Sequence, residues 1–125
     1  MKVMIETFTP KLAKFGFCSA LLAITILSLL PGDIDLPGSV WSDKISHFLA
    51  YFVVGVLYLT AYSNSTRAIV WGLVALVCWG GLIELTQGLP VIGRNGDAMD
   101  LLANGTGVVA AFVLYLGFRW VWQRF

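Results

Sequence analysis

Charged residues are scarce in this chain and rarely interrupt its apolar segments. Only 12% of its 125 residues are charged, whereas 58% are hydrophobic, and the mean hydropathy is +0.84. In soluble domains about a quarter of the residues are charged, so this composition excludes an ordinary water-soluble fold and predicts an integral membrane protein. The net charge of +1 gives no general attraction to nucleic acid, and we expect no nucleic-acid partner.

Cysteines are also few, and the motifs of several enzyme classes are absent. Cys18 and Cys78 both lie within apolar segments without a neighbouring histidine or aspartate. We therefore expect buried free thiols, neither a disulfide nor a catalytic pair. The sequence has no glycine-rich phosphate loop, no nucleophile elbow, no helical zinc-protease motif and no internal repeat.

Four apolar segments are long enough to cross a bilayer as helices, which takes about 20 residues. Proline, glycine and Ser-Asn-Ser turn signals separate them, and Ser42 is the expected N-cap of the second. The sequence predicts one all-α membrane domain over residues 1–125, a compact bundle of four transmembrane helices. The expected spans are residues 12–30, 43–62, 67–88 and 100–122.

Basic residues predict the orientation of these spans. In a four-span topology, six of them fall on one side: Lys2, Lys11, Lys14, Arg67, Arg119 and Arg124. Basic residues mark the cytoplasmic side, so we expect both termini inside. The opposite loops hold Lys44 and Arg94 as their only basic residues, and they are rich in aspartate. We expect a multi-pass protein of the inner or plasma membrane whose acidic loops face the periplasm or cell exterior.

Polar residues gather at the span ends that should meet on this outward side. They are Asp43, Lys44 and His47 in the second span, Glu84 and Gln87 in the third, and Arg94, Asp97, Asp100 and Asn104 before and in the fourth. Ionisable groups at membrane depth usually face the bundle interior and pair with one another. We therefore predict that these residues form one outward-facing polar pocket.

Helical spacing supports a shared pocket. Asp43, His47 and Tyr51 recur every four residues and so occupy one face of a helix. Small residues lie further inward on the third and fourth spans: Gly80, Gly81, Gly107 and Ala111. Because small residues let helices approach closely, we expect a bundle that is tight inside and opens outward.

These motifs together resemble those of a known family. The chain has Asp-Lys-x-x-His-Phe at residues 43–48, Glu-x-x-Gln at 84–87, Arg94 with Asp97 and Asp100, and Asn-x-x-Gly at 104–107. In order and spacing they resemble the VanZ-like family, over about residues 41–116. That family consists of small multi-span membrane proteins named for a member that lowers susceptibility to the glycopeptide teicoplanin. The resemblance implies a role in the cell envelope and implies that the motif residues carry the function.

A binding function is the favoured hypothesis. The pocket would hold the polar head of a membrane lipid, a lipid-linked cell-wall precursor or the glycopeptide itself. Lys44, His47 and Arg94 would bind phosphate or carboxylate groups. The other polar residues would bond sugar or amide groups: Glu84, Gln87, Asp100 and Asn104.

Two further hypotheses remain open. In an intramembrane hydrolase or phosphoester-processing enzyme, Glu84 or His47 would act as general base, with Asp100 or Asp43 orienting it. These four residues would alternatively hold a divalent cation that activates water. Their spacing matches no established metal motif, so the sequence leaves the cofactor undetermined. A structural membrane subunit, in which the polar residues tolerate mutation, is the third hypothesis.

Overall fold

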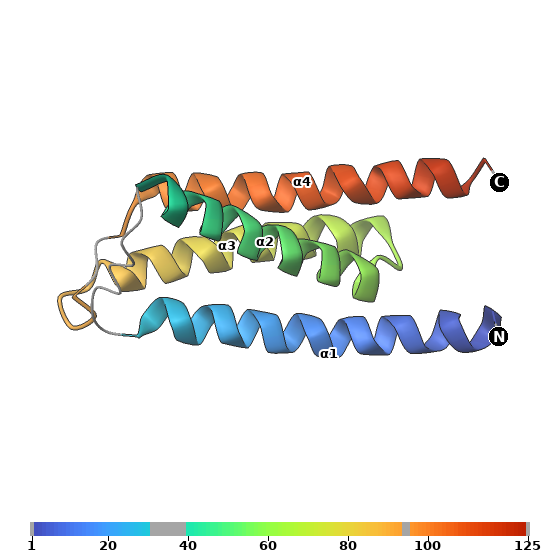
Figure 1. Ribbon diagram of the computed structural model, residues 1–125, viewed down its shortest axis with the longest axis horizontal. Coiled ribbons are helices and arrows are strands. Elements are labelled where there is room, and N and C mark those ends of the chain that lie inside the picture. The colour runs from blue at the N-terminus through green and yellow to red at the C-terminus, as the bar shows by residue number, and fades with distance from the viewer. Residues whose placement is uncertain (1, 31–39, 94–95, 125) are drawn as a thin grey trace.

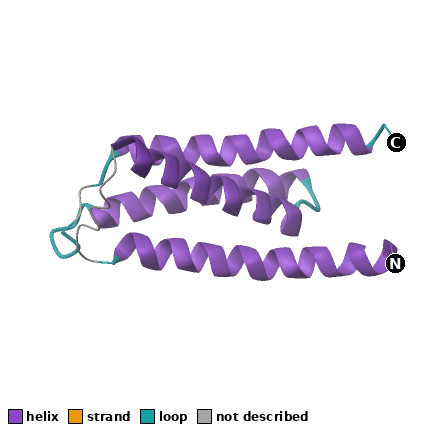
Figure 2. Ribbon diagram, in the orientation of Figure 1, coloured by secondary structure: helices purple, strands orange, loops and turns teal. Residues whose placement is uncertain are grey.

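A computed structural model describes residues 2–30, 40–93 and 96–124, with the side chains of residues 9–30, 43–93 and 96–124. This part of the chain forms four helices and no strand (Figures 1 and 2). They are α1 (Lys2–Leu29), α2 (Val40–Tyr62), α3 (Thr66–Gln87) and α4 (Ala98–Trp122). Each contains a segment long and apolar enough to cross a membrane. The predicted all-α bundle with four candidate transmembrane helices is confirmed.

The helices run lengthwise past one another, which separates the bundle into two ends (Figure 1). The end of α1, the start of α2, the end of α3 and the start of α4 lie at one end. The start of α1, the turn between α2 and α3 and the end of α4 lie at the other. The polar motifs therefore share one end of the bundle, opposite the two chain termini.

Local sequence explains where α3 and α4 begin. Ser65 is the N-cap of α3, and its hydroxyl accepts a hydrogen bond of 3.1 Å from the N–H of Ala68. Asp97 caps α4 in the same way, accepting from the N–H of Met99 at 2.8 Å. The prediction that Ser42 caps α2 is wrong, because α2 begins earlier, at Val40.

The first helix also starts earlier than predicted, at Lys2 instead of about Leu12. Pro10 lies inside it without ending it. The prediction counted only the apolar residues that a bilayer requires, whereas the helix continues beyond them into residues 2–8, which include Lys2 and Glu6. At this end of the chain, α1 is therefore longer than its candidate membrane-crossing segment.

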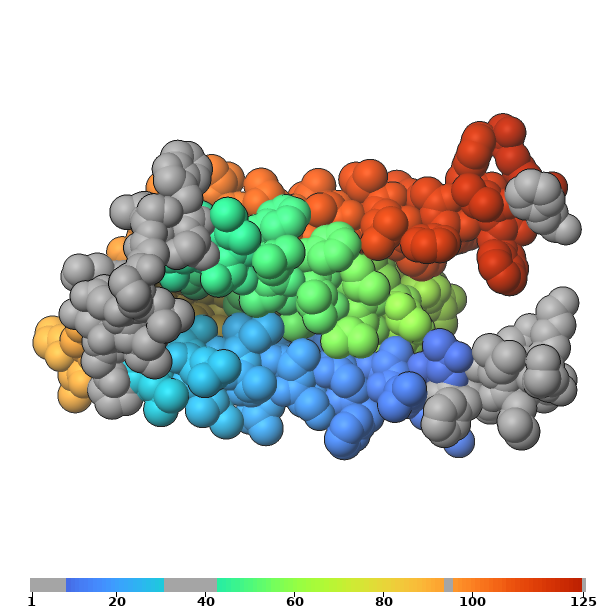
Figure 3. Space-filling model, in the orientation of Figure 1, coloured from blue at the N-terminus to red at the C-terminus, as the bar shows by residue number. Residues whose placement is uncertain are grey.

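Helix α2 organises the packing: it contacts the other three helices and meets α4 most extensively. On the face seen in Figure 3 it lies between α1 and α4, and the described part of α1 makes no contact with α4. Gly107 on α4 lies against the backbone of Phe48 and Phe52, with no space for a Cβ. At Gly55, an added Cβ would lie 2.8 Å from that of Ala111. The predicted close approach at Gly107 is confirmed, and Gly55 supplies its counterpart on α2.

The two other predicted glycine contacts differ from each other. A Cβ at Gly80 would lie 3.0 Å from the Asn104 amide and 3.1 Å from the Tyr51 hydroxyl, so the absence of a side chain there makes room for polar groups. At Gly81 the nearest atom would be 3.7 Å away, in ordinary van der Waals contact.

The outer faces of the helices are apolar, as a lipid environment requires. The prediction that the two cysteines are buried is wrong. Cys18 and Cys78 are free, but both are exposed on the outside of the bundle. A thiol behaves as a small apolar group, so a lipid-facing position suits it as well as a position in the protein core.

Candidate functional site

A partly buried lysine joins α2 to α4. The Lys44 ammonium donates hydrogen bonds to carboxylate oxygens of Asp97 and Asp100. The side chains of Lys44 and Asp100 are 15% and 8% exposed, whereas that of Asp97 is 44% exposed. Two carboxylates thus lie against the Lys44 ammonium, which is the one described lysine or arginine at this end of the bundle. The positive charge of Lys44 is directed toward α4.

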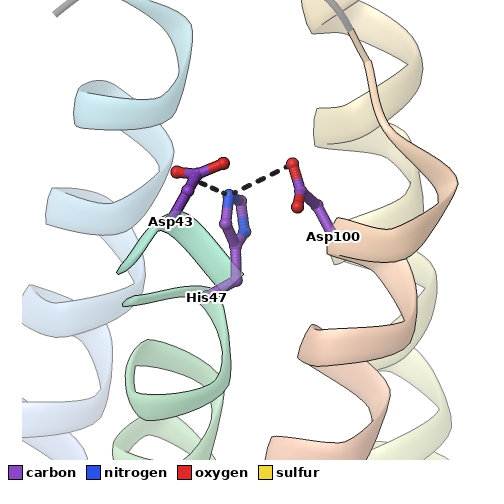
Figure 4. A group of neighbouring side chains, drawn as sticks. All are labelled: Asp43, His47 and Asp100. Carbon is purple, nitrogen blue, oxygen red and sulfur yellow. Dashed lines mark ion pairs between the residues drawn. The ribbon is translucent and has the colours of Figure 1, made fainter. Parts of the chain in front are cut away.

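The imidazole of His47 lies at the centre of the remaining polar groups. Its Nε2 lies 3.8 Å from Asp43 Oδ1 and 3.6 Å from Asp100 Oδ2, so one ring nitrogen faces two carboxylates (Figure 4). Its Nδ1 lies 3.1 Å from Asn104 Oδ1 and 3.8 Å from Glu84 Oε1. Three helices therefore converge on the single histidine of the chain.

Glu84 is the most unusual member of the group. Its residue is only 7% exposed, and Oε2 accepts a hydrogen bond of 3.3 Å from the Asp97 N–H. Oε1 is buried and has no hydrogen-bond partner among the described residues; the Tyr51 hydroxyl shares this property. Buried polar atoms without partners are uncommon in proteins, and each one suggests a missing ligand or a functional strain.

Asp97 lies just outside the apolar span of α4, and its pKa is lowered from the ordinary value. The Lys44 ammonium is the main cause, and the N–H of Met99 adds to it. Both interactions favour the charged carboxylate, so Asp97 stays ionised to a lower pH than a free aspartate does.

A cavity of about 230 Å³ lies beside this group, between α1, α2 and α3. Its polar lining includes Asp43, His47, Tyr51 and Gln87, and its apolar lining includes Ile24, Leu27 and Ala50. The Gln87 amide also donates a hydrogen bond of 2.8 Å to the backbone carbonyl of Ser28, which ties α3 to α1.

Most of the predicted pocket residues are brought together. Seven form one network, which we call the polar cluster: Asp43, Lys44, His47, Glu84, Asp97, Asp100 and Asn104. Gln87 lines the adjacent cavity. Arg94, the ninth, lies outside the described residues. With His47 neutral and every carboxylate ionised, four carboxylates and one ammonium give the cluster a formal net charge of −3.

Sequence reasoning missed the contribution of α1 to the cavity. Ile24 and Leu27 carry no ionisable or hydrogen-bonding side chain, and the third α1 residue of the lining, Ser28, offers only an uncharged hydroxyl, which is a weak signal in the sequence. Tyr51 was placed on the same helical face as His47 but was not among the predicted site residues. Its buried hydroxyl beside the cavity now adds it to them.

Comparison of the chain with protein-family models, with curated proteins and with solved structures gives no match.

Proposed function

We propose that this protein is a VanZ-like protein of the cell envelope that binds the polar head group of an envelope lipid or of a lipid-linked cell-wall intermediate. The observation that carries the proposal is the cavity between α1, α2 and α3. One part of its lining is polar and includes Asp43 and His47 of the polar cluster, and the other part is apolar. An amphipathic cavity suits a ligand that is itself part polar and part hydrocarbon.

Cavity size and position favour a head group over a whole lipid. A volume of about 230 Å³ equals the liquid volume of roughly eight water molecules. It has room for a small polar head group, while the acyl or prenyl chains would remain in the bilayer beside α1 and α2. Ile24 and Leu27 would cover the first carbons of these chains.

The charges favour recognition through hydrogen bonds. Lys44 is already engaged by Asp97 and Asp100, so it has little capacity left for a phosphate. His47, Tyr51 and Gln87 line the cavity and offer donors and acceptors. This combination suits sugar hydroxyls or amides, with Asp43 as a further acceptor.

Lipid retention tests the proposal. The protein would be purified in mild detergent with a polyprenyl-phosphate sugar or phosphatidylglycerol added, and the bound lipid counted by native mass spectrometry. We expect one retained lipid per chain and a loss of at least about tenfold in affinity for His47→Ala, as for a central contact worth about 1.4 kcal/mol or more. Leu85→Ala, on the outer face of α3 at 74% exposure, is the control. Equal retention by the two variants would contradict the proposal.

The orientation belongs to the same proposal. On the distribution of basic residues, we propose that the termini are cytoplasmic and that the polar cluster faces outward. In a Cys18→Ala, Cys78→Ala background, a cysteine at Val91 should react with an impermeant thiol reagent in intact cells. A cysteine at Asn64, in the turn at the opposite end, should not. The reverse pattern would show the opposite orientation.

Cell assays separate the remaining hypotheses. If the protein lowers teicoplanin susceptibility by binding, Glu84→Gln should abolish this effect while membrane abundance stays constant. An intramembrane enzyme would in addition release a product from the added lipid during incubation with the purified protein. A structural subunit would retain full function with Glu84→Gln, and that result would contradict the proposed role of the pocket.

A further inference from the structure

We propose that Asp43, His47 and Asp100 form a binding site for one divalent transition-metal ion of the Zn²⁺ type, held between α2 and α4. Each residue offers one ligand atom, and the three atoms lie within 4.8 Å of one another (Figure 4). The site does not depend on the proposed head-group function.

The hydrogen bond at Nδ1 determines whether Nε2 of His47 can bind a metal ion. Nδ1 lies 3.1 Å from Asn104 Oδ1, an amide oxygen that accepts a hydrogen bond and cannot donate one. A proton on Nδ1 leaves the lone pair of Nε2 directed at Asp43 and Asp100. Metal-binding histidines are held in this way by an oxygen acceptor behind the ring. Asn104 is only 1% exposed, so this acceptor is fixed in place.

The distances favour a bridging ion over direct hydrogen bonds. Nε2 lies 3.6 Å from Asp100 Oδ2 and 3.8 Å from Asp43 Oδ1. Both separations exceed the range of about 2.7–3.2 Å of an N–H···O hydrogen bond. Two ligands at about 2.0–2.2 Å from a tetrahedral metal ion are about 3.3–3.6 Å apart. The Asp43 side chain, 57% exposed, is free to rotate the remaining distance.

The described groups of the cluster carry more negative than positive charge. With His47 neutral and all four carboxylates ionised, their formal net charge is −3, because Lys44 is the one lysine or arginine among the described residues of the cluster. Glu84 Oε1, buried and without a hydrogen bond, is directed at the same imidazole from 3.8 Å. A divalent ion on Nε2 would polarise the ring toward this carboxylate and reduce the repulsion among the four.

The ligand types select the ion. One imidazole nitrogen with two carboxylate oxygens suits Zn²⁺ or a similar transition metal, whereas Mg²⁺ and Ca²⁺ prefer oxygen ligands alone. Asp100 has its second oxygen on Lys44, so a charged hydrogen bond orients it. Because Asp43 and His47 also line the cavity, the open coordination position would face that space.

Metal titration tests the site. The protein, purified in detergent and stripped with a chelator, would be titrated with Zn²⁺ by calorimetry and with Co²⁺ as an optical probe. We expect one ion per chain. We expect each of three variants to weaken Zn²⁺ binding at least about tenfold: Asp43→Asn, His47→Gln and Asp100→Asn. Even residues that only hydrogen-bond to a metal ligand typically reduce metal affinity by about tenfold or more when they are mutated.

Asp97→Asn is the matched control. It removes the same charge at the same end of the bundle, and asparagine preserves the helix cap, but Asp97 faces Lys44 instead of His47. It should leave the Zn²⁺ affinity within about threefold, since an exposed charge outside the three proposed ligands is screened by solvent. Asp43→Asn, at an exposed side chain, keeps the test valid if the His47 variant fails to fold.

Two results would overturn the site: the absence of a saturable Zn²⁺ site in the wild-type protein, or an equal loss of affinity in Asp97→Asn and Asp43→Asn. Lipid retention is measured separately. Zn²⁺ binding without lipid retention would refute the head-group proposal alone, and lipid retention without Zn²⁺ binding would refute the metal site alone.

Discussion

Helices α2 and α4 meet in two regions of opposite character. The outer region is the end of the bundle that holds the polar cluster, and there Lys44 and His47 face Asp100. The inner region lies further along the same two helices, where Gly107 touches the backbone of α2 and Gly55 faces Ala111. The outer region joins the helices through long side chains, and the inner one joins them through the absence of side chains.

The inner region positions the outer one. Phe48, whose carbonyl Gly107 contacts, directly follows His47, and Asn104 lies about one turn from Gly107. The close crossing therefore fixes the distance between the imidazole and its amide partner. We infer that packing at the inner region holds the polar cluster in register, and that damage there should affect both regions, whereas damage to the cluster should leave the packing intact.

The largest effect should come from Gly107→Leu. A side chain at this position meets the α2 backbone, which cannot move aside as a flexible side chain would. We expect a loss above about 3 kcal/mol, beyond the usual range for overpacking, and little folded protein in the membrane. Gly105→Leu, where an added Cβ has nothing within 4 Å, is the control. Thermal unfolding in detergent would measure both, and equal stability would disprove the role of the close crossing.

Next in size should be Lys44→Met. Removing the ammonium leaves Asp100 buried without its charge partner, and breaking a buried ion pair in this way costs about 3–5 kcal/mol. Because Asp97 is 44% exposed and can return to water, we expect a smaller loss, about 2–3 kcal/mol. Lys44→Met combined with Asp100→Asn should recover part of it. No recovery in thermal unfolding would mean that Lys44 acts through packing alone.

The apolar segments and their turn signals sufficed to predict the four helices, because helix formation in a membrane follows from local sequence. The gathering of polar residues could also be predicted, since the connections bring those helix ends together. The pairing of Lys44 with Asp97 and Asp100 could not. It depends on the register of α2 against α4, which Gly55 and Gly107 set through contacts distant in sequence.

The predictions that failed share a cause. Ser42 and the two cysteines were judged from residue type. The residue at which a helix begins decides which residue caps it, and the phase of the helix decides which side chains lie on the outside of the bundle. The contribution of α1 to the cavity was missed for a related reason, because Ile24 and Leu27 are as apolar as their neighbours and Ser28 carries no charge.

A smaller effect, of opposite sign, is expected for Tyr51→Phe. The Tyr51 hydroxyl is buried without a hydrogen-bond partner among the described residues, and such a group costs about 1–3 kcal/mol. The variant should therefore gain about 1 kcal/mol of stability in the purified, lipid-free protein. If the hydroxyl binds the head group, the same variant should retain less lipid. A loss of stability in the lipid-free protein would show that the hydroxyl is satisfied within the fold.

The smallest effect should be that of Asp97→Asn on stability, and it should depend on pH. Because Lys44 and the Met99 N–H lower the pKa of Asp97 in the folded protein, ionised Asp97 stabilises the fold above its unfolded pKa of about 3.9. This contribution is lost as the pH falls through the lower, folded pKa. The melting temperatures of wild type and Asp97→Asn should thus differ by a constant amount between about pH 7 and 5 and converge below about pH 4. Other carboxylates titrate in both proteins, so only their difference reports on Asp97. Because asparagine keeps the helix cap, a difference that shows no decrease as the pH falls below about 4 would mean that Asp97 does not contribute through its charge on Lys44.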